Sequence, residues 1–290
     1  MAATSTADRS TRFLFSRADI RGEVVHLNDA YQELLGAHDY SATTATLLGQ
    51  FAAAAVLISN NLKYHGRIIL QARSERALSL IMVECSSELE IRGIARGDIS
   101  NHADNPLDLI AGGQLALTIE RDGGQRYQGI VALDADSLAD ALSDYFEQSE
   151  QLQTRFMLAA SAGEAAGFML QQLPAQVAQD AADRQEQWQT VTVLADTLTQ
   201  NELLTLDAEV LLHRLYHEYD LQLFEPKALT YRCRCTRQRS LDALSLLPAD
   251  ELEAALEDEG VITMTCEMCN ATYEFAREEL PTLAEDRILH

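Results

Sequence analysis

The chain has 290 residues, of which 47% are hydrophobic and 23% are charged, so it can bury the core of one large domain or two smaller ones. Its formal net charge of −23 repels phosphate backbones and anionic lipid headgroups, which argues against nucleic acid and membrane as partners. The first residues, Met1 to Arg12, contain no apolar segment typical of a secretory signal. The longest apolar stretch, Leu47 to Ile58, is shorter than the roughly 20 residues of a membrane span and predicts a buried helix.

The first 175 residues alternate between strand and helix patterns, which predicts a mixed α+β domain over residues 1–175. The helices are expected to start near Asn28 and Ser41, and a third is expected over 137–148. Gly123 and Gly124 supply the positive φ angles of a hairpin turn. The strands are expected at 13–15, 22–27, 67–72, 77–85, 89–95, 113–120, 127–133, 154–160 and 165–170.

Pro174 marks a change, because the residues from 175 to 187 are rich in Ala, Gln and Asp. We place a domain boundary here and expect a helical linker over residues 176–226. Asp207 is the expected cap of its second helix. Apolar residues recur at helical spacing at Trp188, Val191, Leu194 and Leu198, and then at Val210, Leu211, Leu215 and Tyr216. These helices are either a subdomain packed on the core or a linker whose apolar face can be uncovered.

Residues 227–290 contain four of the five cysteines, as Cys233-x-Cys235 and Cys266-x-x-Cys269. Four thiols in two close pairs can hold one Zn²⁺ in a tetrahedral site, so we predict a small zinc-binding domain. Strand patterns at 261–265 and 272–275 flank the second pair, and Asn270 tolerates the left-handed conformation of a tight turn. Two short helices are expected between the pairs, the second running from 248 to 256 and ended by Gly260.

The same four thiols can also form two disulfides. Arg232, Arg234, Arg237 and Arg239 surround the first pair, and their charge would offset the thiolates and lower thiol pKa values. A disulfide across Cys-x-Cys closes a very small ring, and strained disulfides are easily reduced, as a reversible switch requires. Because structural zinc contributes folding free energy, its loss would be expected to unfold this module.

The remaining candidate residues have simpler interpretations. Cys85 lies alone in an apolar strand and is interpreted as a core residue. His213 and His217 lie on an amphipathic helix and are interpreted as structural. No phosphate loop, Ser-His-Asp arrangement or carboxylate pair is found, so we favour a binding protein without catalysis. Two alternatives stay open, namely a zinc-ribbon nucleic-acid-binding protein and a thiol-disulfide oxidoreductase that uses Cys266 and Cys269.

The cysteine motifs, together with upstream segments, resemble the heat shock protein 33 family of bacterial redox-regulated holdase chaperones. The C-terminal signature is Cys233-x-Cys235-Thr236-Arg237 with Cys266-Glu267-Met268-Cys269-Asn270 and Tyr273. The upstream segments are 21–22, 47–49, 114–118, 127–131 and 145–151, so the resemblance covers essentially the whole chain. Residues 71–76 depart from it, because family members usually have a glycine-rich turn there.

The resemblance implies a mechanism. Reduced, the four cysteines hold one zinc ion per chain and the protein is a poor chaperone. Oxidation forms the disulfides Cys233–Cys235 and Cys266–Cys269, releases zinc, and unfolds the zinc domain and linker, which exposes a binding surface for unfolding client proteins. The family resemblance also implies a homodimer when oxidised, hand-off of clients to an ATP-dependent foldase system, and a cytoplasmic location, which the five cysteines without a signal peptide favour as well.

Overall fold

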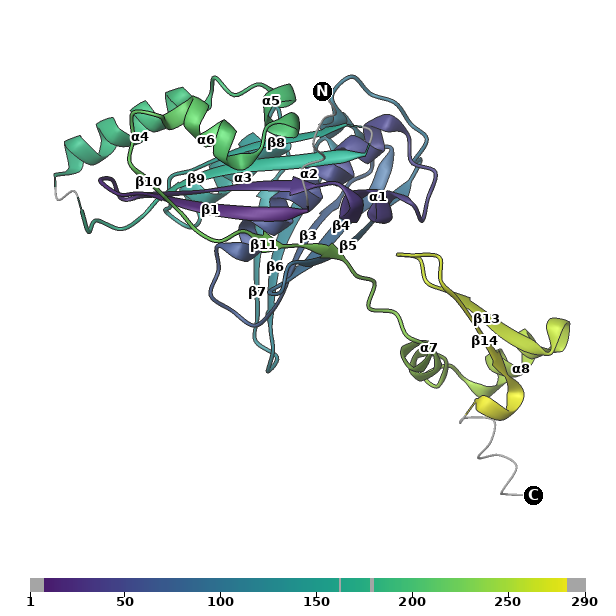
Figure 1. Cartoon of the computed structure of the whole chain (residues 1–290). Coiled ribbons are helices and arrows are strands. Elements are labelled where there is room, and N and C mark those ends of the chain that lie inside the picture. Colours follow the sequence, from purple (N-terminus) through teal and green to yellow (C-terminus); the bar gives the residue numbers. More distant parts are fainter. Residues whose placement is uncertain (1–7, 162, 178–179, 281–290) are drawn as a thin grey trace. The chain divides into compact units, whose positions relative to one another are not determined.

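The structure is a computed structural model that describes residues 8–161, 163–177 and 180–280. The first seven residues, where the sequence shows no secretory signal, lie outside the described part. The chain divides into two compact units, Met1–Arg232 and Cys233–His290. The first unit combines two sheets with several helices, and the second is a small unit of helices and one hairpin (Figure 1). The predicted α+β fold class is confirmed.

The first sheet of the larger unit has the strand order β10-β1-β2-β9-β8, and β11 also pairs with β1. All its pairs are antiparallel, and every residue of β2 pairs with β9. Its strands are β1 (Arg9–Phe15), β2 (Ile20–Leu27), β8 (Thr154–Ser161), β9 (Glu164–Gln172), β10 (Leu221–Leu223) and β11 (Lys227–Ala228).

The second sheet has the order β12-β5-β4-β3-β6-β7. Its pairs are antiparallel except that β12 runs parallel to β5. The predicted hairpin between β6 and β7 is confirmed, with φ values of +100° at Gly123 and +92° at Gly124. The strands are β3 (Gly66–Arg73), β4 (Leu78–Ser86), β5 (Glu90–Gly97), β6 (Gln114–Arg121), β7 (Arg126–Ala132) and β12 (Thr230–Tyr231).

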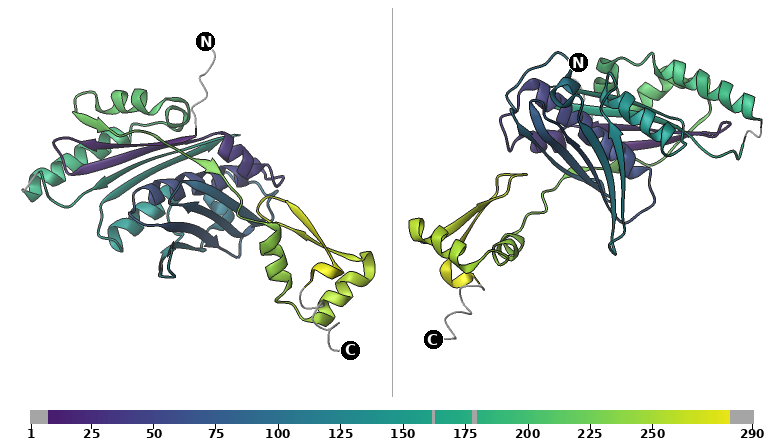
Figure 2. Two further views of the ribbon diagram at one scale, coloured as in Figure 1. Left: turned by 60° about the horizontal axis from the view of Figure 1, so that its bottom comes forward. Right: turned by 180° about the vertical axis from the view of Figure 1, so that it is seen from behind.

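Helix α2 (Ala42–Asn60) contacts strands of both sheets and forms the centre of the main core (Figures 1 and 2). Ser41 caps it by accepting a hydrogen bond from the backbone N–H of Thr44. A Cβ at Gly49 would lie within 3 Å of Tyr31 and Ala160, so glycine permits this close packing. The helix is long and apolar enough to cross a membrane, but 78% of its most apolar window is buried in the fold. The predicted buried helix is therefore confirmed.

The other helical segments of this unit are shorter than α2. Asp8 lies before β1, and its carboxylate accepts hydrogen bonds from the backbone N–H groups of Asn28 and Ala30 at the start of α1. This carboxylate therefore satisfies amide groups that a helix leaves unpaired at its N-terminus. These segments are α1 (Asp29–Leu35), the 3₁₀ helix η1 (Pro106–Ile110), α3 (Leu138–Gln148), α4 (Ala181–Ala195), α5 (Gln200–Thr205) and α6 (Ala208–Tyr216).

Helices α4 to α6 cover one face of the first sheet and share a second core cluster with it (Figure 1). On α6 the buried residues are spaced 3, 1, 3 and 1 apart, which places them on one side of the helix. Val210 falls between them and is 55% exposed, so its predicted place on the apolar face was wrong. The buried cluster comprises Phe13, Phe15, Ala18, Ile20, Val24, Ala159, Ala166, Phe168, Leu170, Trp188, Val191, Ala195, Leu203, Ala208, Leu211, Leu212, Leu215 and Tyr216.

Asp207 stands at the N-cap position of α6 as predicted, but its side chain forms no capping hydrogen bond. Its carboxylate instead forms a 2.5 Å ion pair with Arg9 of β1. After α6 the chain returns to the sheets as β10, β11 and β12, three short strands that sequence patterns did not predict. Lys227 in β11 donates a hydrogen bond to the Asn60 side chain at the end of α2, at 2.8 Å. The segment after the helices is thus joined to the core of the first unit.

The second unit has a small core of its own. Helix α8 ends at Gly260, whose φ of +72° matches the predicted C-cap. Its elements are α7 (Arg237–Leu244), α8 (Ala249–Glu259), β13 (Val261–Thr265), β14 (Thr272–Ala276) and the 3₁₀ helix η2 (Arg277–Glu279). The buried apolar residues are Leu244, Leu252, Leu256, Phe275 and Leu280. A core of this size stabilises a unit only marginally, so a bound metal ion would contribute a large share of its folding free energy.

Candidate metal centre

The four cysteines of the second unit come from two loops. Cys233 and Cys235 lie in the irregular segment before α7, whereas Cys266 and Cys269 lie in the turn that joins β13 to β14. The turn is closed by a hydrogen bond from the Asn270 N–H to the Cys266 carbonyl at 2.8 Å. Asn270 has a φ of +56°, which confirms its predicted left-handed conformation. Because the second pair lies in a hairpin, it lacks the helix N-terminus that activates thiols in many oxidoreductases.

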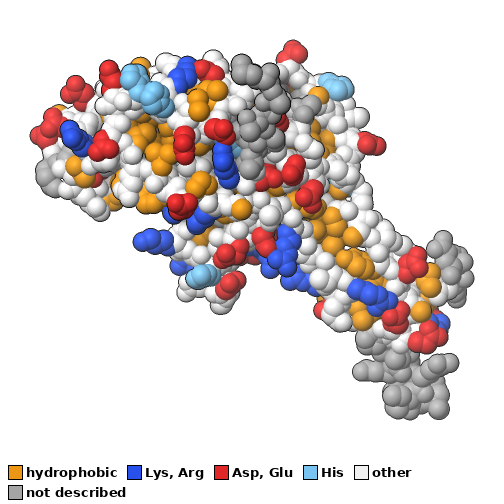
Figure 3. Space-filling model, in the orientation of Figure 1, with side chains coloured by type: hydrophobic (Ala, Val, Ile, Leu, Met, Phe, Trp, Pro, Cys, Tyr) orange, Lys and Arg blue, Asp and Glu red, His pale blue; other side chains and the backbone are white. Residues whose placement is uncertain are grey.

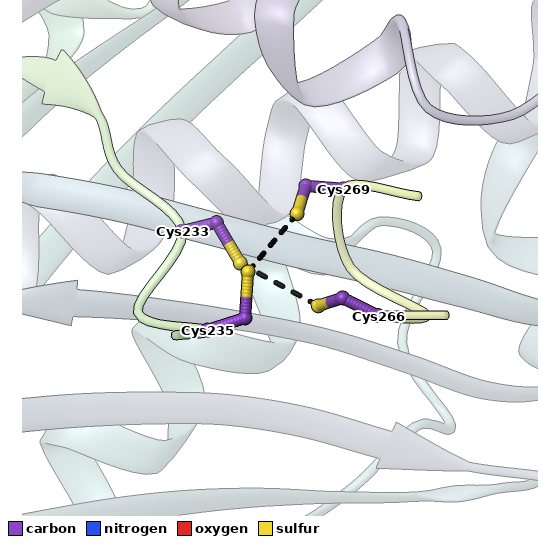
Figure 4. Close-up of side chains that lie close together, drawn as sticks. All are labelled: Cys233, Cys235, Cys266 and Cys269. Atoms are coloured by element: carbon purple, nitrogen blue, oxygen red, sulfur yellow. Dashed lines mark hydrogen bonds between the residues drawn. The ribbon is translucent and has the colours of Figure 1, made fainter. Parts of the chain in front are cut away.

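The fold brings the four predicted thiols together (Figure 4). All four sulfur atoms lie within 4.8 Å of one another. The Sγ atoms of Cys233 and Cys266 are 3.7 Å apart, and those of Cys235 and Cys269 are 3.4 Å apart. Four sulfurs at about 2.3 Å from a tetrahedral zinc ion would be roughly 3.8 Å from each other. The donor set and its spacing therefore fit a metal ion such as zinc.

The four thiols differ in acidity. Burial raises the pKa of Cys233, but hydrogen bonds from the Cys235 backbone and the neighbouring thiols outweigh this effect and bring the pKa down to about 7. Burial raises the pKa of Cys235 and of Cys269. Without a cation, burial therefore disfavours the thiolate forms of Cys235 and Cys269. A divalent cation would offset that penalty and allow these thiols to deprotonate.

Tyr273 contributes a hydroxyl group to the cluster. This tyrosine was not predicted as a site residue from the sequence. Its Oη lies 3.4 Å from the Cys235 sulfur, and this contact raises the pKa of the phenol to about 12. The hydroxyl therefore stays protonated and can donate to a Cys235 thiolate. Tyr273 lies on β14, four residues after Cys269, and its place in the C-terminal family signature was the available signal.

Four arginines were expected to offset the charge of the Cys233 and Cys235 thiolates. Three of them instead bind carboxylates or backbone carbonyls. Arg232, in the first unit, forms a 2.5 Å ion pair with Glu90. Arg237 pairs with Glu279 at 2.7 Å and lies over the Phe275 ring, 4.5 Å from its centroid. Arg239 donates to the backbone carbonyl of Arg234 at 2.8 Å. Arg237 and Arg239 therefore hold the local backbone in place.

The other candidate residues lie elsewhere. Cys85 is fully buried, and burial raises the pKa of its thiol to about 12, which confirms its interpretation as a core residue. His213 and His217 are exposed, with ring centroids 5.9 Å apart. Within the described ranges, no second group of three or more His, Cys, Asp or Glu side chains brings its ligand atoms together.

Comparison with known proteins identifies the family. The family model described as Hsp33 protein matches residues 8–276. The 33 kDa chaperonins of Pseudomonas paraeruginosa and Azotobacter vinelandii are each 48% identical to this chain, over 282 and 286 residues, with 96% of this chain and 95% of each relative covered. The crystal structure of the 33 kDa chaperonin from Thermotoga maritima has a TM-score of 0.81 at 22% identity, covers 98% of this chain and 100% of its own, and shares the fold. The chain belongs to the Hsp33 family of chaperones.

Proposed function

We propose that this chain is a redox-regulated holdase, which binds unfolding proteins when its four clustered cysteines are oxidised. The observation that carries the proposal is the four-thiol cluster, set in a unit whose own apolar core is small. Membership of a chaperone family supports the binding of unfolded clients. The remaining parts of the proposal are a cytoplasmic location, dimerisation on oxidation, hand-off to an ATP-dependent foldase and the absence of catalysis.

In the reduced protein, Cys233, Cys235, Cys266 and Cys269 would hold one zinc ion. Bound zinc would keep the thiols deprotonated and join the two loops, which stabilises the small unit. Tyr273 holds the Cys235 sulfur in place through its hydroxyl. The residues of the chain thus provide all four ligands and one supporting hydrogen bond.

Oxidation would convert the cluster to two disulfides. Each disulfide would form one S–S bond from two thiolates, which give up two electrons. One hydrogen peroxide molecule accepts these electrons and two protons from solvent as its O–O bond breaks, and yields two water molecules. We propose the pairing Cys233–Cys235 and Cys266–Cys269 on the basis of the family resemblance. The shortest sulfur distances join Cys233 to Cys266 and Cys235 to Cys269, so peptide mapping of the oxidised protein decides between these pairings.

The change would reach the first unit through the chain itself. Cys233 follows β12 and Arg232 directly, and β10 to β12 follow helix α6. We propose that unfolding of the second unit loosens this segment and then helices α4 to α6. The uncovered surface would include the aromatic residues Phe13, Phe15 and Phe168 of the first sheet. Such a surface binds the apolar segments that unfolding proteins expose.

Zinc release during peroxide treatment tests the switch. We expect reduced protein to carry one zinc ion per chain and to release it in step with thiol loss, as followed with a colorimetric chelator and a thiol reagent. A Cys85→Ser variant should release zinc along the same curve, because this thiol is buried in the core of the first unit. Full zinc retention after all four thiols are oxidised would contradict the proposal.

A further inference from the structure

Residues 176–232 form one continuous segment, and polar contacts fasten both of its ends to the core of the first unit. At its start, Asp19 in the turn between β1 and β2 binds residues before and within α4. Near its end, Lys227 of β11 contacts a group of polar side chains around Glu23 of β2. The two fastenings differ in burial and in their number of hydrogen bonds, which indicates the order in which the segment can detach.

The fastening at Asp19 is a buried ion pair with additional hydrogen bonds. The Asp19 carboxylate lies 2.6 Å from the Arg184 guanidinium, and the two side chains are 5% and 16% exposed. The same carboxylate accepts hydrogen bonds from the backbone N–H groups of Gln176 at 3.1 Å and Val177 at 2.9 Å. Arg184 also donates to the Leu173 carbonyl at 2.7 Å. Since separation of a buried ion pair is strongly destabilising, these contacts hold residues 173–177 and the start of α4 firmly.

The fastening at Lys227 is a single side-chain hydrogen bond at an exposed residue. The Lys227 ammonium group donates to the side-chain oxygen of Asn60 at 2.8 Å. The nitrogen of the same amide donates to Ser10 at 2.8 Å and to the Glu23 carboxylate at 3.0 Å. Glu23 also accepts hydrogen bonds from Ser10 and Asn61. These buried partners orient the Asn60 amide so that its oxygen faces Lys227.

Three further ion pairs between described residues join the segment to the core, and their side chains are 29% to 68% exposed. Ion pairs that are this accessible to water contribute little to stability, because solvent and salt screen them. They are Arg9–Asp207, Arg155–Asp196 and Arg232–Glu90. The strongest ion pair along the segment is therefore the one at its start.

We propose that the Asp19–Arg184 ion pair is a fixed anchor, and that the segment detaches from its other end when the second unit unfolds. Loss of the Lys227 contact frees β11, α6 and α5 follow, and the opening stops within α4 at Arg184. The anchor keeps the detached helices tied to the sheet that they cover, so they can return when the second unit refolds. The inference rests on the redox switch proposed above and names the residues that limit how far it opens.

Hydrogen exchange of the full-length, reduced and zinc-loaded protein in low concentrations of urea tests the order of detachment without oxidation. Mass spectrometry of peptic fragments compares the protection of amides in 173–177 with that of amides in 221–230. We expect the second group to exchange through a partial opening, at urea concentrations at which the first group is at least about tenfold better protected. Equal protection of the two groups at all urea concentrations would overturn the proposal.

Substitution of the two lysines of the chain tests the end that detaches first. Lys227→Met removes the ammonium group and keeps most of the side-chain length, so amides in 221–230 should exchange about tenfold faster and those in 173–177 should not change. Lys63→Met alters the other lysine, which lies in the loop after α2, and should change neither group. Parental exchange of 221–230 in Lys227→Met would show that this contact does not hold the end of the segment and would overturn the proposal.

Substitution of Arg184 tests the anchor. In Arg184→Gln, the amides of 173–177 should lose protection together with α4 and exchange at least about tenfold faster than in the parent protein. Arg155→Gln breaks a half-exposed ion pair of the same helix and should leave them protected. Arg184→Lys keeps the positive charge and should restore part of the protection, which separates the ion pair from a general loss of packing. Parental protection of 173–177 in Arg184→Gln would contradict the anchor.

Hydrogen exchange after peroxide oxidation distinguishes a failure of the anchor from a failure of the redox switch. If residues 185–230 lose protection while 173–177 keep it, both proposals are supported. If residues 173–230 lose protection together, the switch stands and the anchor is excluded. If oxidation changes neither group but urea produces the expected order, the anchor stands and the switch is excluded.

Discussion

At the scale of single residues, the sulfur cluster is contacted by a hydroxyl group outside the set of four cysteines. The phenol of Tyr273 stays protonated and points at the sulfur of Cys235, so it can stabilise the thiolate form of that ligand. Groups of this kind commonly change metal affinity by one to two orders of magnitude when they are removed. We therefore expect Tyr273 to affect how firmly the cluster holds a metal ion.

Substitution of this tyrosine tests its role. We expect Tyr273→Phe to keep one zinc ion per chain but to weaken its affinity by about tenfold in competition with a chelator. The control is Tyr64→Phe, which removes a hydroxyl bonded to Ser59 in the first unit and should leave zinc affinity unchanged. Equal zinc affinities in Tyr273→Phe and the parent protein would show that this hydrogen bond does not support the site.

His26 makes the packing of helix α5 sensitive to pH. Its Nε2 lies 3.1 Å from the Leu203 carbonyl, and its Nδ1 is buried with no hydrogen-bond partner among the described residues. Burial lowers the pKa of His26 below the value of about 6.5 expected in the unfolded chain. Below pH 6.5 the unfolded state therefore binds more protons than the folded state, and stability falls as the pH falls.

Denaturant unfolding at several pH values measures this effect. Between pH 6.5 and 5.5 the free energy of unfolding of the parent protein should fall by up to about 1 kcal/mol more than that of His26→Gln, which cannot titrate. His213→Gln removes an exposed imidazole from α6 and should retain the parental pH dependence. If the free energy of unfolding has the same pH dependence in the parent protein and in His26→Gln, His26 does not cause the loss of stability at low pH.

At the scale of elements, α4 offers a matched pair of residues. Val191 is fully buried against the first sheet, whereas Val193 on the same helix is 65% exposed. An aspartate at 191 would place an unpaired charge in the second core cluster, at a cost of several kcal/mol, so α4 should leave the sheet. The single tryptophan of the chain, Trp188, lies on this helix and is 9% exposed.

We expect Val191→Asp to shift the Trp188 emission to longer wavelength and to give the reduced protein client-binding activity. Val193→Asp should change neither property, since its side chain already faces solvent. Tryptophan fluorescence and a client aggregation assay on reduced, zinc-loaded protein measure both. A shifted emission without gain of client binding would mean that the surface beneath α4 does not bind clients.

The elements also show what sequence patterns could predict. Helix α2, most of the long strands and the cysteine hairpin carry strong periodicity or turn signals, and they were expected close to their observed bounds. Strand β1 was expected over 13–15 but begins four residues earlier, at Arg9. Strands β10 to β12 have two or three residues each, too few for a period, and pairing with β1 and β5 creates them. Val210 was wrongly predicted to lie on the buried face of α6, because a single apolar residue does not determine which side of a helix is buried. Asp207 failed as a cap because Arg9, distant in sequence, binds its carboxylate.

At the scale of the whole molecule, stability and charge are unevenly distributed. The first unit has two extensive apolar clusters, whereas the described part of the second has one small cluster. The acidic excess of the chain keeps it soluble, and Figure 3 shows acidic and basic side chains interspersed on the first unit. The unit that contains the oxidisable thiols is thus the one with the smaller apolar core. This asymmetry suits a protein whose smaller part unfolds while the larger part remains folded.

Light scattering of a heat-denatured client protein tests the redox switch most directly. The reduced, zinc-loaded chain and the peroxide-oxidised chain are compared at equal concentration, with zinc content measured in each sample. We predict that the oxidised protein suppresses scattering at near-stoichiometric amounts, that the reduced protein does not, and that prior reduction of the oxidised sample with zinc restores the inactive state. Equal suppression by both forms would contradict regulation by the four cysteines.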